Sequence, residues 1–268
     1  MPDALLDGWL ARALLLVVGG YASVVPVAWL GADRLIFLPP PATYRAGDDV
    51  VTLSTADGGR IAAIHLPHPG ARYTILFSHG NAEDLGMLRP YLRLLHGLGF
   101  GVLAYDYRGY GLSDGRPSEE ATYHDIDAAW TFLVAEAKVP PERIILLGRS
   151  VGAGPSVDLA ARRQVGGLVL ESAFVSAFRV LTRVPLLPFD RFRNLDKIGR
   201  VACPVLVMHG EADAIVPIWH GRRLYEAAPA PKRFLWVEGA GHNDFMLVAG
   251  PRYGQALRDF AALLGGDG

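Results

Sequence analysis

One stretch of the chain, residues 144–152, restricts the possible folds more than any other. An apolar run, Ile144 to Leu147, leads into Gly148-Arg149-Ser150-Val151-Gly152, and a helix-like segment of small residues follows. Gly-x-Ser-x-Gly between a strand and a helix is typical of a sharp turn that exposes the serine above a sheet. The glycines leave room for that turn, and the following helix points its positive amino end toward the serine. The alternative is a serine that only caps a helix, because short motifs also arise by chance.

Strand-like and helix-like segments alternate along most of the chain. Strands are expected at 50–54, 61–65, 74–78, 101–105, 144–147, 168–171, 205–209 and 234–237, and helices at 85–96, 119–138, 151–163, 219–228 and 251–264. A hairpin opens this series, and the later strands are each followed by a helix. This pattern predicts an α/β fold with a mostly parallel sheet and helices on both faces. Ligands of such folds bind outside the carboxyl ends of the strands.

Four loops that follow strands carry candidate site residues. Ser150, Asp213 and His242 follow three of these strands in that order, and Asn81 follows a fourth. A serine hydroxyl becomes a nucleophile when an imidazole accepts its proton, and a carboxylate holds that imidazole in the required tautomer. The backbone N–H groups of Asn81 and Val151 are candidate donors to the oxyanion. The order Ser…Asp…His is the one found in α/β-hydrolases.

Each candidate has an alternative interpretation. Asp213 could be an ordinary turn residue, and Glu171, at the end of its own strand, is a rival acid. His242 could be a surface histidine of its loop. The other histidines lack metal-ligand spacing, so we expect no metal ion and no other cofactor. The single cysteine, Cys203, precedes a proline and an apolar run, which favours a buried structural thiol.

The amino-terminal region is a separate apolar segment. Residues 13–30 carry no charge, and Trp9 and Trp29 lie near the ends of this run. Its length is close to the minimum for a membrane span, and interfacial aromatic residues are typical of one. A helix packed on the domain and a cleaved signal peptide are the alternatives. We expect residues 1–38 to form this anchor or packed helix and residues 39–268 to form the catalytic domain. The flanking charges do not assign a side of the membrane.

Several further motifs resemble those of the α/β-hydrolase-domain serine hydrolases, and in particular the membrane-associated protein depalmitoylases and their bacterial relatives. They are Ser78-His79-Gly80-Asn81-Ala82-Glu83-Asp84-Leu85-Gly86, Tyr105-Asp106-Tyr107-Arg108-Gly109-Tyr110-Gly111, Gly115 to Glu119, Asp125 to Trp130 and Trp236 to Asp244. The resemblance covers Thr74 to the carboxyl end and implies the α/β-hydrolase fold. It also implies the roles of nucleophile, acid and base for Ser150, Asp213 and His242. The chain departs from the eukaryotic depalmitoylases in one respect: it has no cysteine before Cys203 that could carry an amino-terminal lipid.

The segment between Glu171 and Val205 is the expected lid, and its length predicts a short one. Apolar side chains in it would line an acyl pocket, and basic side chains outnumber acidic ones there. A basic rim would suit an anionic bilayer, whereas the alternative is an ordinary solvated excursion between strands.

These observations predict a serine ester hydrolase that cleaves acyl esters or thioesters through an acyl-enzyme, on lipid-like substrates near a membrane. A peptidase or amidase with the same three residues is the alternative enzyme, and a non-catalytic interaction module of the same fold is the alternative from another class. The net charge of −1 argues against a nucleic-acid partner. The oligomeric state is not predicted.

Overall fold

The centre of the molecule is an eight-stranded sheet with the order β1-β2-β4-β3-β5-β6-β7-β8. The computed structural model describes residues 3–47 and 49–265, with side chains from residue 8 onward. The strands are β1 Val50–Ser54, β2 Arg60–Leu66, β3 Thr74–Ser78, β4 Gly101–Tyr105, β5 Ile144–Arg149, β6 Gly167–Glu171, β7 Val205–Gly210 and β8 Lys232–Val237. β2 is antiparallel to both β1 and β4, and all other neighbours are parallel. The predicted strands and the mostly parallel sheet are confirmed.

The helices follow the sequence pattern closely. They are α1 Asp3–Ile36, α2 Leu85–Gly97, α3 Glu119–Thr131, α4 Ala153–Arg162, α5 Arg179–Thr182, α6 Asn194–Ile198, α7 Trp219–Ala227, α8 Phe245–Ala249 and α9 Pro251–Leu264. Two of the predicted helices change geometry at one end. The helix expected over residues 119–138 ends in a π-helical turn, Phe132–Glu136. The helix expected from Val151 starts with a 3-10 turn, Ser150–Gly152.

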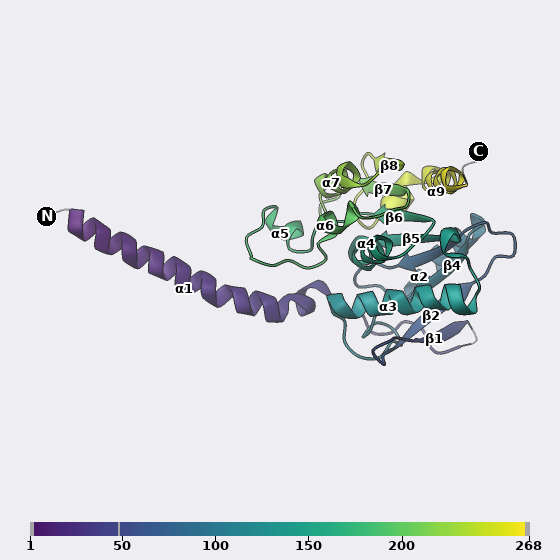
Figure 1. Ribbon diagram of the computed structural model, residues 1–268, viewed down its shortest axis with the longest axis horizontal. Helices are drawn as coiled ribbons and strands as arrows, with labels where there is room; N and C mark the ends of the chain where they lie inside the picture. Colours follow the sequence, from purple (N-terminus) through teal and green to yellow (C-terminus); the bar gives the residue numbers. More distant parts are fainter. Residues whose placement is uncertain (1–2, 48, 266–268) are drawn as a thin grey trace.

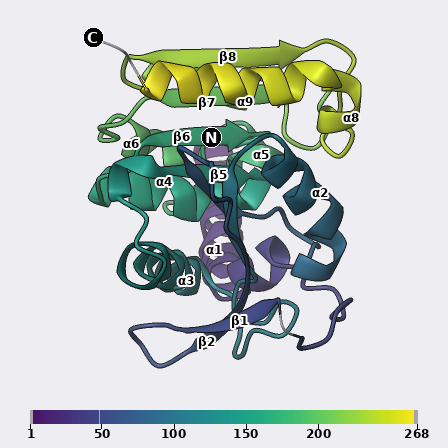
Figure 2. The same cartoon turned by 90° about the vertical axis from the view of Figure 1, so that its right-hand side faces the viewer.

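Side-chain alternation along the strands divides the core into two halves, one on each face of the sheet. Leu146 of β5 packs in the half that contains Ile126 of α3 and Val157 of α4. The next residue, Leu147, packs in the other half, with Leu88 of α2 and side chains of α9. Figure 2 shows the helices on the two sides of the sheet. Because successive strand residues face opposite sides, fully apolar strands such as β5 are those that helices cover on both faces.

The parallel register brings the carboxyl ends of the central strands to one edge. Ser78 at the end of β3 is paired with Gly148 of β5, and Glu171 at the end of β6 is paired with Met208 of β7. His209 of β7 lies beside Trp236 of β8. The loops that carry the candidate residues therefore start from the same edge of the sheet.

Helix α1 projects away from the rest of the molecule (Figure 1), and its contacts with the domain include the Tyr21 hydroxyl, which donates to the carbonyl of Leu186 at 2.9 Å. The described apolar side chains of α1 include Leu15, Leu16 and Leu30, which are largely exposed. Just beyond the helix, Phe37 is buried in the core and contacts the rings of Tyr110 and Phe192. The division between residues 38 and 39 stays a prediction, since the chain already enters the core at Phe37.

Candidate active site

The Gly-x-Ser-x-Gly segment forms a tight turn between β5 and α4. Ser150 has a φ of +52°, a left-handed conformation that is strained for a residue with a side chain. A Cβ atom on Gly148 would lie 2.5 Å from the carbonyl oxygen of Gly152, and one on Gly152 would lie 2.1 Å from the carbonyl oxygen of Ser78. Both positions thus require glycine, and the second places the turn directly against the end of β3.

The structure brings Ser150, His242 and Asp213 together at the carboxyl edge of the sheet. The Ser150 Oγ lies 3.1 Å from Nε2 of His242, and Nδ1 of His242 lies 2.8 Å from Oδ2 of Asp213. Ser150 comes from the turn after β5, Asp213 from the loop after β7 and His242 from the loop after β8. This chain of contacts can pass a proton from the serine to the imidazole and hold the imidazole in one tautomer.

Asp213 is a buried carboxyl surrounded by donors. Its Oδ1 accepts hydrogen bonds from the amides of Ile215 at 3.0 Å and Val216 at 2.7 Å, and its Oδ2 lies 3.4 Å from Nε2 of His209. Burial raises the pKa of this carboxyl, but the contact with His209 and the hydrogen bonds with His242 and Val216 outweigh burial and hold the pKa well below its usual range. Asp213 is therefore ionised at neutral pH.

Glu171, the rival acid, lies in a different environment. The Tyr253 hydroxyl donates to its Oε2 at 2.7 Å, and Tyr253 is in turn 2.6 Å from the hydroxyl of Tyr91. Within the described part of the chain, Glu171 makes no hydrogen bond to His242. Burial raises the pKa of Glu171, against the opposing effects of Arg149 and the Tyr253 hydrogen bond.

The loop after β3 carries Asn81, and the preceding Gly80 lies close to Arg149 of the turn that carries Ser150. The Asn81 side chain is a clamp: Nδ2 donates to the carbonyl of Ile36 at 2.6 Å, and Oδ1 accepts from the amide of Leu38 at 2.9 Å and from Tyr110 Oη at 2.6 Å. The backbone amide of Asn81 donates no hydrogen bond to the residues the structure describes. The amide of Val151 belongs to the first turn of a helix, where N–H groups have no intrahelical partner. Both amides are thus available to a ligand.

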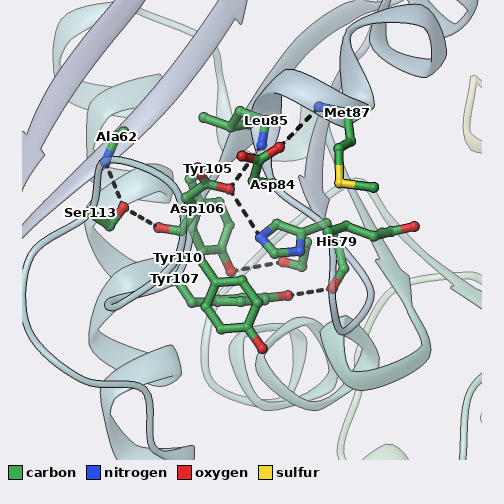
Figure 3. Close-up of polar contacts among 12 residues, drawn as sticks. Ala62, His79, Asp84, Leu85, Met87, Tyr105, Asp106, Tyr107, Tyr110 and Ser113 are labelled. Atoms are coloured by element: carbon green, nitrogen blue, oxygen red, sulfur yellow. Dashed lines mark hydrogen bonds and ion pairs between the residues drawn. The ribbon is translucent and has the colours of Figure 1, made fainter. Parts of the chain in front are cut away.

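A buried polar cluster supports this loop from below. His79 Nδ1 lies 2.7 Å from the carbonyl oxygen of Gly80, and His79 Nε2 lies 3.4 Å from Oδ1 of Asp106. The Tyr107 hydroxyl donates to the carbonyl of His79 at 2.7 Å, and Figure 3 shows the imidazole enclosed by these groups. His79 has no exposed surface. It therefore braces the backbone next to Asn81.

The segment between β6 and β7 contains the short helices α5 and α6, and part of it stands out from the sheet near α1 (Figure 1). It encloses a pocket of about 350 Å³, lined by Val175, Ser176, Phe178, Arg179, Thr182, Pro185, Leu186, Leu187, Pro188, Phe189, Asp190, Arg193, Leu195 and Asp196. Leu181, Val184 and Leu186 expose more than half of their surface. None of the lining residues is Ser150, Asp213 or His242.

Two charged residues beside the candidate site were not predicted from the sequence. Arg149, within the motif, forms an ion pair with Glu83, two residues after Asn81. Their opposite charges next to two site motifs were the available signal.

Cys203 is buried as predicted, and burial raises the pKa of its thiol to about 12. Among the described residues no cluster of His, Cys, Asp or Glu could hold a metal ion.

Comparison with solved structures identifies the fold. The Pyrococcus furiosus esterase Pf2001 superimposes with a TM-score of 0.71 at 20% identity, over 84% of this chain and 98% of that one. The esterase domain of a Rhodothermus marinus protein gives a TM-score of 0.57 at 24% identity, over 80% and 95%. The predicted α/β-hydrolase fold is confirmed.

Comparison of sequences identifies the family. Residues 69–188 match the Hydrolase_4 family, described as serine aminopeptidase, S33. The human α/β-hydrolase domain-containing protein 17B is 44% identical over 262 residues, which are 86% of this chain and 90% of that protein. The Xenopus laevis protein 17B is 43% identical over the same shares. The predicted resemblance to the α/β-hydrolase-domain serine hydrolases is confirmed, and the chain belongs to the family of α/β-hydrolase domain-containing proteins 17.

Proposed function

We propose that this α/β hydrolase cleaves acyl esters or thioesters through an acyl-enzyme on Ser150. The contact of Ser150 with His242, and of His242 with Asp213, carries this proposal. The family and the esterase neighbours support a hydrolase of this type. The free amides of Asn81 and Val151 add the two donors that the chemistry needs.

The reaction follows from these positions. Ser150 Oγ attacks the acyl carbonyl while Nε2 of His242 accepts its proton, and Asp213 stabilises the imidazolium. The carbonyl oxygen becomes negatively charged and accepts hydrogen bonds from the two amides. The leaving alcohol or thiol takes the proton from His242, and the acyl group stays on Ser150. A water molecule then attacks the acyl carbon while His242 takes its proton. The bond between the acyl carbon and Ser150 Oγ breaks, His242 returns the proton to Oγ, and the acid leaves.

We assign the substrate to a membrane surface. No residue in the window of α1 that is long and apolar enough to cross a membrane is buried, so this window does not serve as a core helix. The exposed lid side chains Leu181, Val184 and Leu186 lie in the segment that contacts α1 through Trp29 and Phe189. A lipid-like acyl chain would reach the site from that side.

An amidase or peptidase is the second candidate, because the matching family is described as an aminopeptidase. The same three residues could carry either reaction, so an amide substrate is tested beside the esters.

The test compares purified wild type and Ser150→Ala on esters and thioesters of increasing acyl length, with an aminoacyl amide beside them. We expect turnover of the esters and thioesters, little turnover of the amide, and a loss of at least about 10³-fold in the variant. Circular dichroism should show that the variant is folded. Preferred cleavage of the amide would replace the ester proposal, and near wild-type turnover by Ser150→Ala would remove the nucleophile.

A further inference from the structure

An ion pair connects the two loops that flank the reacting serine. Arg149 directly precedes Ser150, and its Nη2 contacts Oε2 of Glu83 in the loop after β3. The same Oε2 accepts the backbone N–H of Gly80 at 3.1 Å. Glu83 therefore binds one loop through a backbone amide and the other through a guanidinium.

The arginine side of this pair is fixed by its surroundings. The guanidinium carbon lies 5.5 Å from the centre of the Phe77 ring and 5.3 Å from that of Tyr91, and its side chain is only 18% exposed. Burial opposes its charge, but Glu83, Glu171 and Tyr91 outweigh burial and raise the pKa of Arg149 above its usual value. Arg149 is a charged group held between aromatic faces, which is a rigid arrangement for a long side chain.

The pair lies against the peptide that leads to Asn81. A Cβ atom on Gly80 would lie 3.2 Å from Oε2 of Glu83 and 3.6 Å from Nε of Arg149. On the other side, Gly152 packs against the carbonyl oxygens of Ser78 and His79. The two loops thus meet at a backbone contact and at this ion pair.

We propose that Glu83 and Arg149 are positioning residues whose ion pair sets the separation of the Asn81 and Val151 amides, so that both donate to one oxyanion. This inference rests on the proposed role of Ser150. Neither side chain takes part in a proton transfer. Their effect reaches the reaction only through the two backbone amides, which bind the transition state more strongly than the substrate.

The first experiment uses Glu83→Gln and Arg149→Lys in the full chain. The glutamine keeps an oxygen that can accept from Gly80 but loses the charge, and the lysine keeps a charge but loses the planar fork. With a short p-nitrophenyl ester, we expect kcat per active site, counted with a fluorophosphonate, to fall by about 10- to 100-fold. KM should stay within about twofold, since loss of transition-state binding alone lowers kcat and kcat/KM together.

A trifluoromethyl ketone that forms an oxyanion on the serine supplies the second readout. Its affinity should fall by the same factor as kcat/KM, which a merely stabilising ion pair would not cause. The double variant should lose about as much as the larger single variant rather than the product of both losses, because the two residues act as one unit.

Arg162→Gln is the matched control. Arg162, at the end of α4, pairs with Asp127 of α3 and with Asp158 of α4, away from the loops, and its replacement should leave kcat unchanged. The proposal is overturned if Glu83→Gln keeps kcat per active site within twofold of wild type, or if the two losses multiply. In either case an inactive Ser150→Ala would leave the proposed function intact, whereas an active one would remove that function itself.

Discussion

At the scale of single residues, the candidate site depends on which carboxyl reaches His242. Both carboxyl groups are buried, but Asp213 accepts hydrogen bonds from two backbone amides and pairs with the His242 imidazole, with His209 at 3.4 Å. Glu171 accepts from the Tyr253 hydroxyl and faces Arg149. Hydrogen bonds to a charged form lower a carboxyl pKa, and burial raises it. The surroundings therefore favour Asp213 as the permanent anion beside the imidazole.

Replacing each carboxyl group by an amide should affect turnover to very different extents. Asp213→Asn should lower kcat on a short ester by about 10⁴-fold, the size of the corresponding change in serine proteases, because the imidazole then takes the wrong tautomer. Glu171→Gln should cost less than about tenfold, since Tyr253 can donate to an amide oxygen. Steady-state kinetics on folded variants measures both, and a reversed order would make Glu171 the acid.

The three candidate residues could be predicted because the order of strands and loops can be read along the sequence. Ser150, Asp213 and His242 each follow a recognisable strand, and a parallel sheet must bring those strand ends together. The pairing of Glu83 with Arg149 was not predictable in the same way. It joins residues 66 positions apart, and only the three-dimensional contact of the β3 and β5 loops shows it.

At the scale of elements, the start of α7 is joined to the loop after β6 by a buried imidazole. Nδ1 of His220 accepts the Val175 amide at 3.2 Å, and the ring stacks on Trp219 with centroids 3.7 Å apart. Burial, with smaller effects of His209 and Arg179, lowers the pKa of His220 to about 4. The neutral ring is thus part of the fold.

Because of His220, we expect the folded protein to lose stability in weak acid. The unfolded chain binds the proton near the ordinary histidine value, and the folded chain only near pH 4, so stability falls as the pH drops through that interval. The cost is at most about 3 kcal/mol, since one pKa unit is worth about 1.4 kcal/mol. Urea unfolding of His220→Gln should show a weaker decline between pH 6.5 and 4 than wild type, measured against His124→Gln as the control. An unchanged decline would contradict this assignment.

Local sequence was less informative where elements change geometry. The pattern over residues 119–138 predicts one continuous helix, and the actual end is a π-helical turn at Phe132–Glu136. Helical periodicity alone does not distinguish the two geometries. By contrast, the sequence offers a reason for the 3-10 turn Ser150–Gly152. Pro155, two residues after Ala153, has no backbone N–H, so it removes one donor from the first turn of α4.

At the scale of the whole molecule, α1 is both an exposed apolar helix and the entry to the core. The Asn81 side chain joins the end of α1 to the candidate site. Trp29 contacts the lid: its ring centroid lies 4.8 Å from that of Phe189 and 4.3 Å from the guanidinium carbon of Arg191. Charge and hydropathy predicted an apolar helix of nearly membrane-spanning length, and the structure shows a long apolar helix there. The attachment at Phe37 was not evident, because a single aromatic residue before three prolines carries no pattern.

Two truncations separate these roles. Deleting residues 1–27 removes most of the apolar helix, so the protein should leave the membrane fraction and lose activity on ester presented in vesicles. Because Trp29 and Phe37 are kept, turnover of a short ester should stay within about threefold.

Deleting residues 1–38 also removes the core contacts of Phe37 and should lower the melting temperature by several degrees. Fractionation, ester assays and thermal melts measure these effects. If the shorter deletion still sedimented with vesicles, α1 would not be the anchor.

The acyl-enzyme itself provides the most direct measurement. The protein is mixed with a short p-nitrophenyl ester, quenched within the first turnover and analysed by intact and tandem mass spectrometry. We expect one acyl group per chain, on Ser150, and none in Ser150→Ala. An acyl group on another residue, or full hydrolysis with no acylated protein at any time, would contradict it.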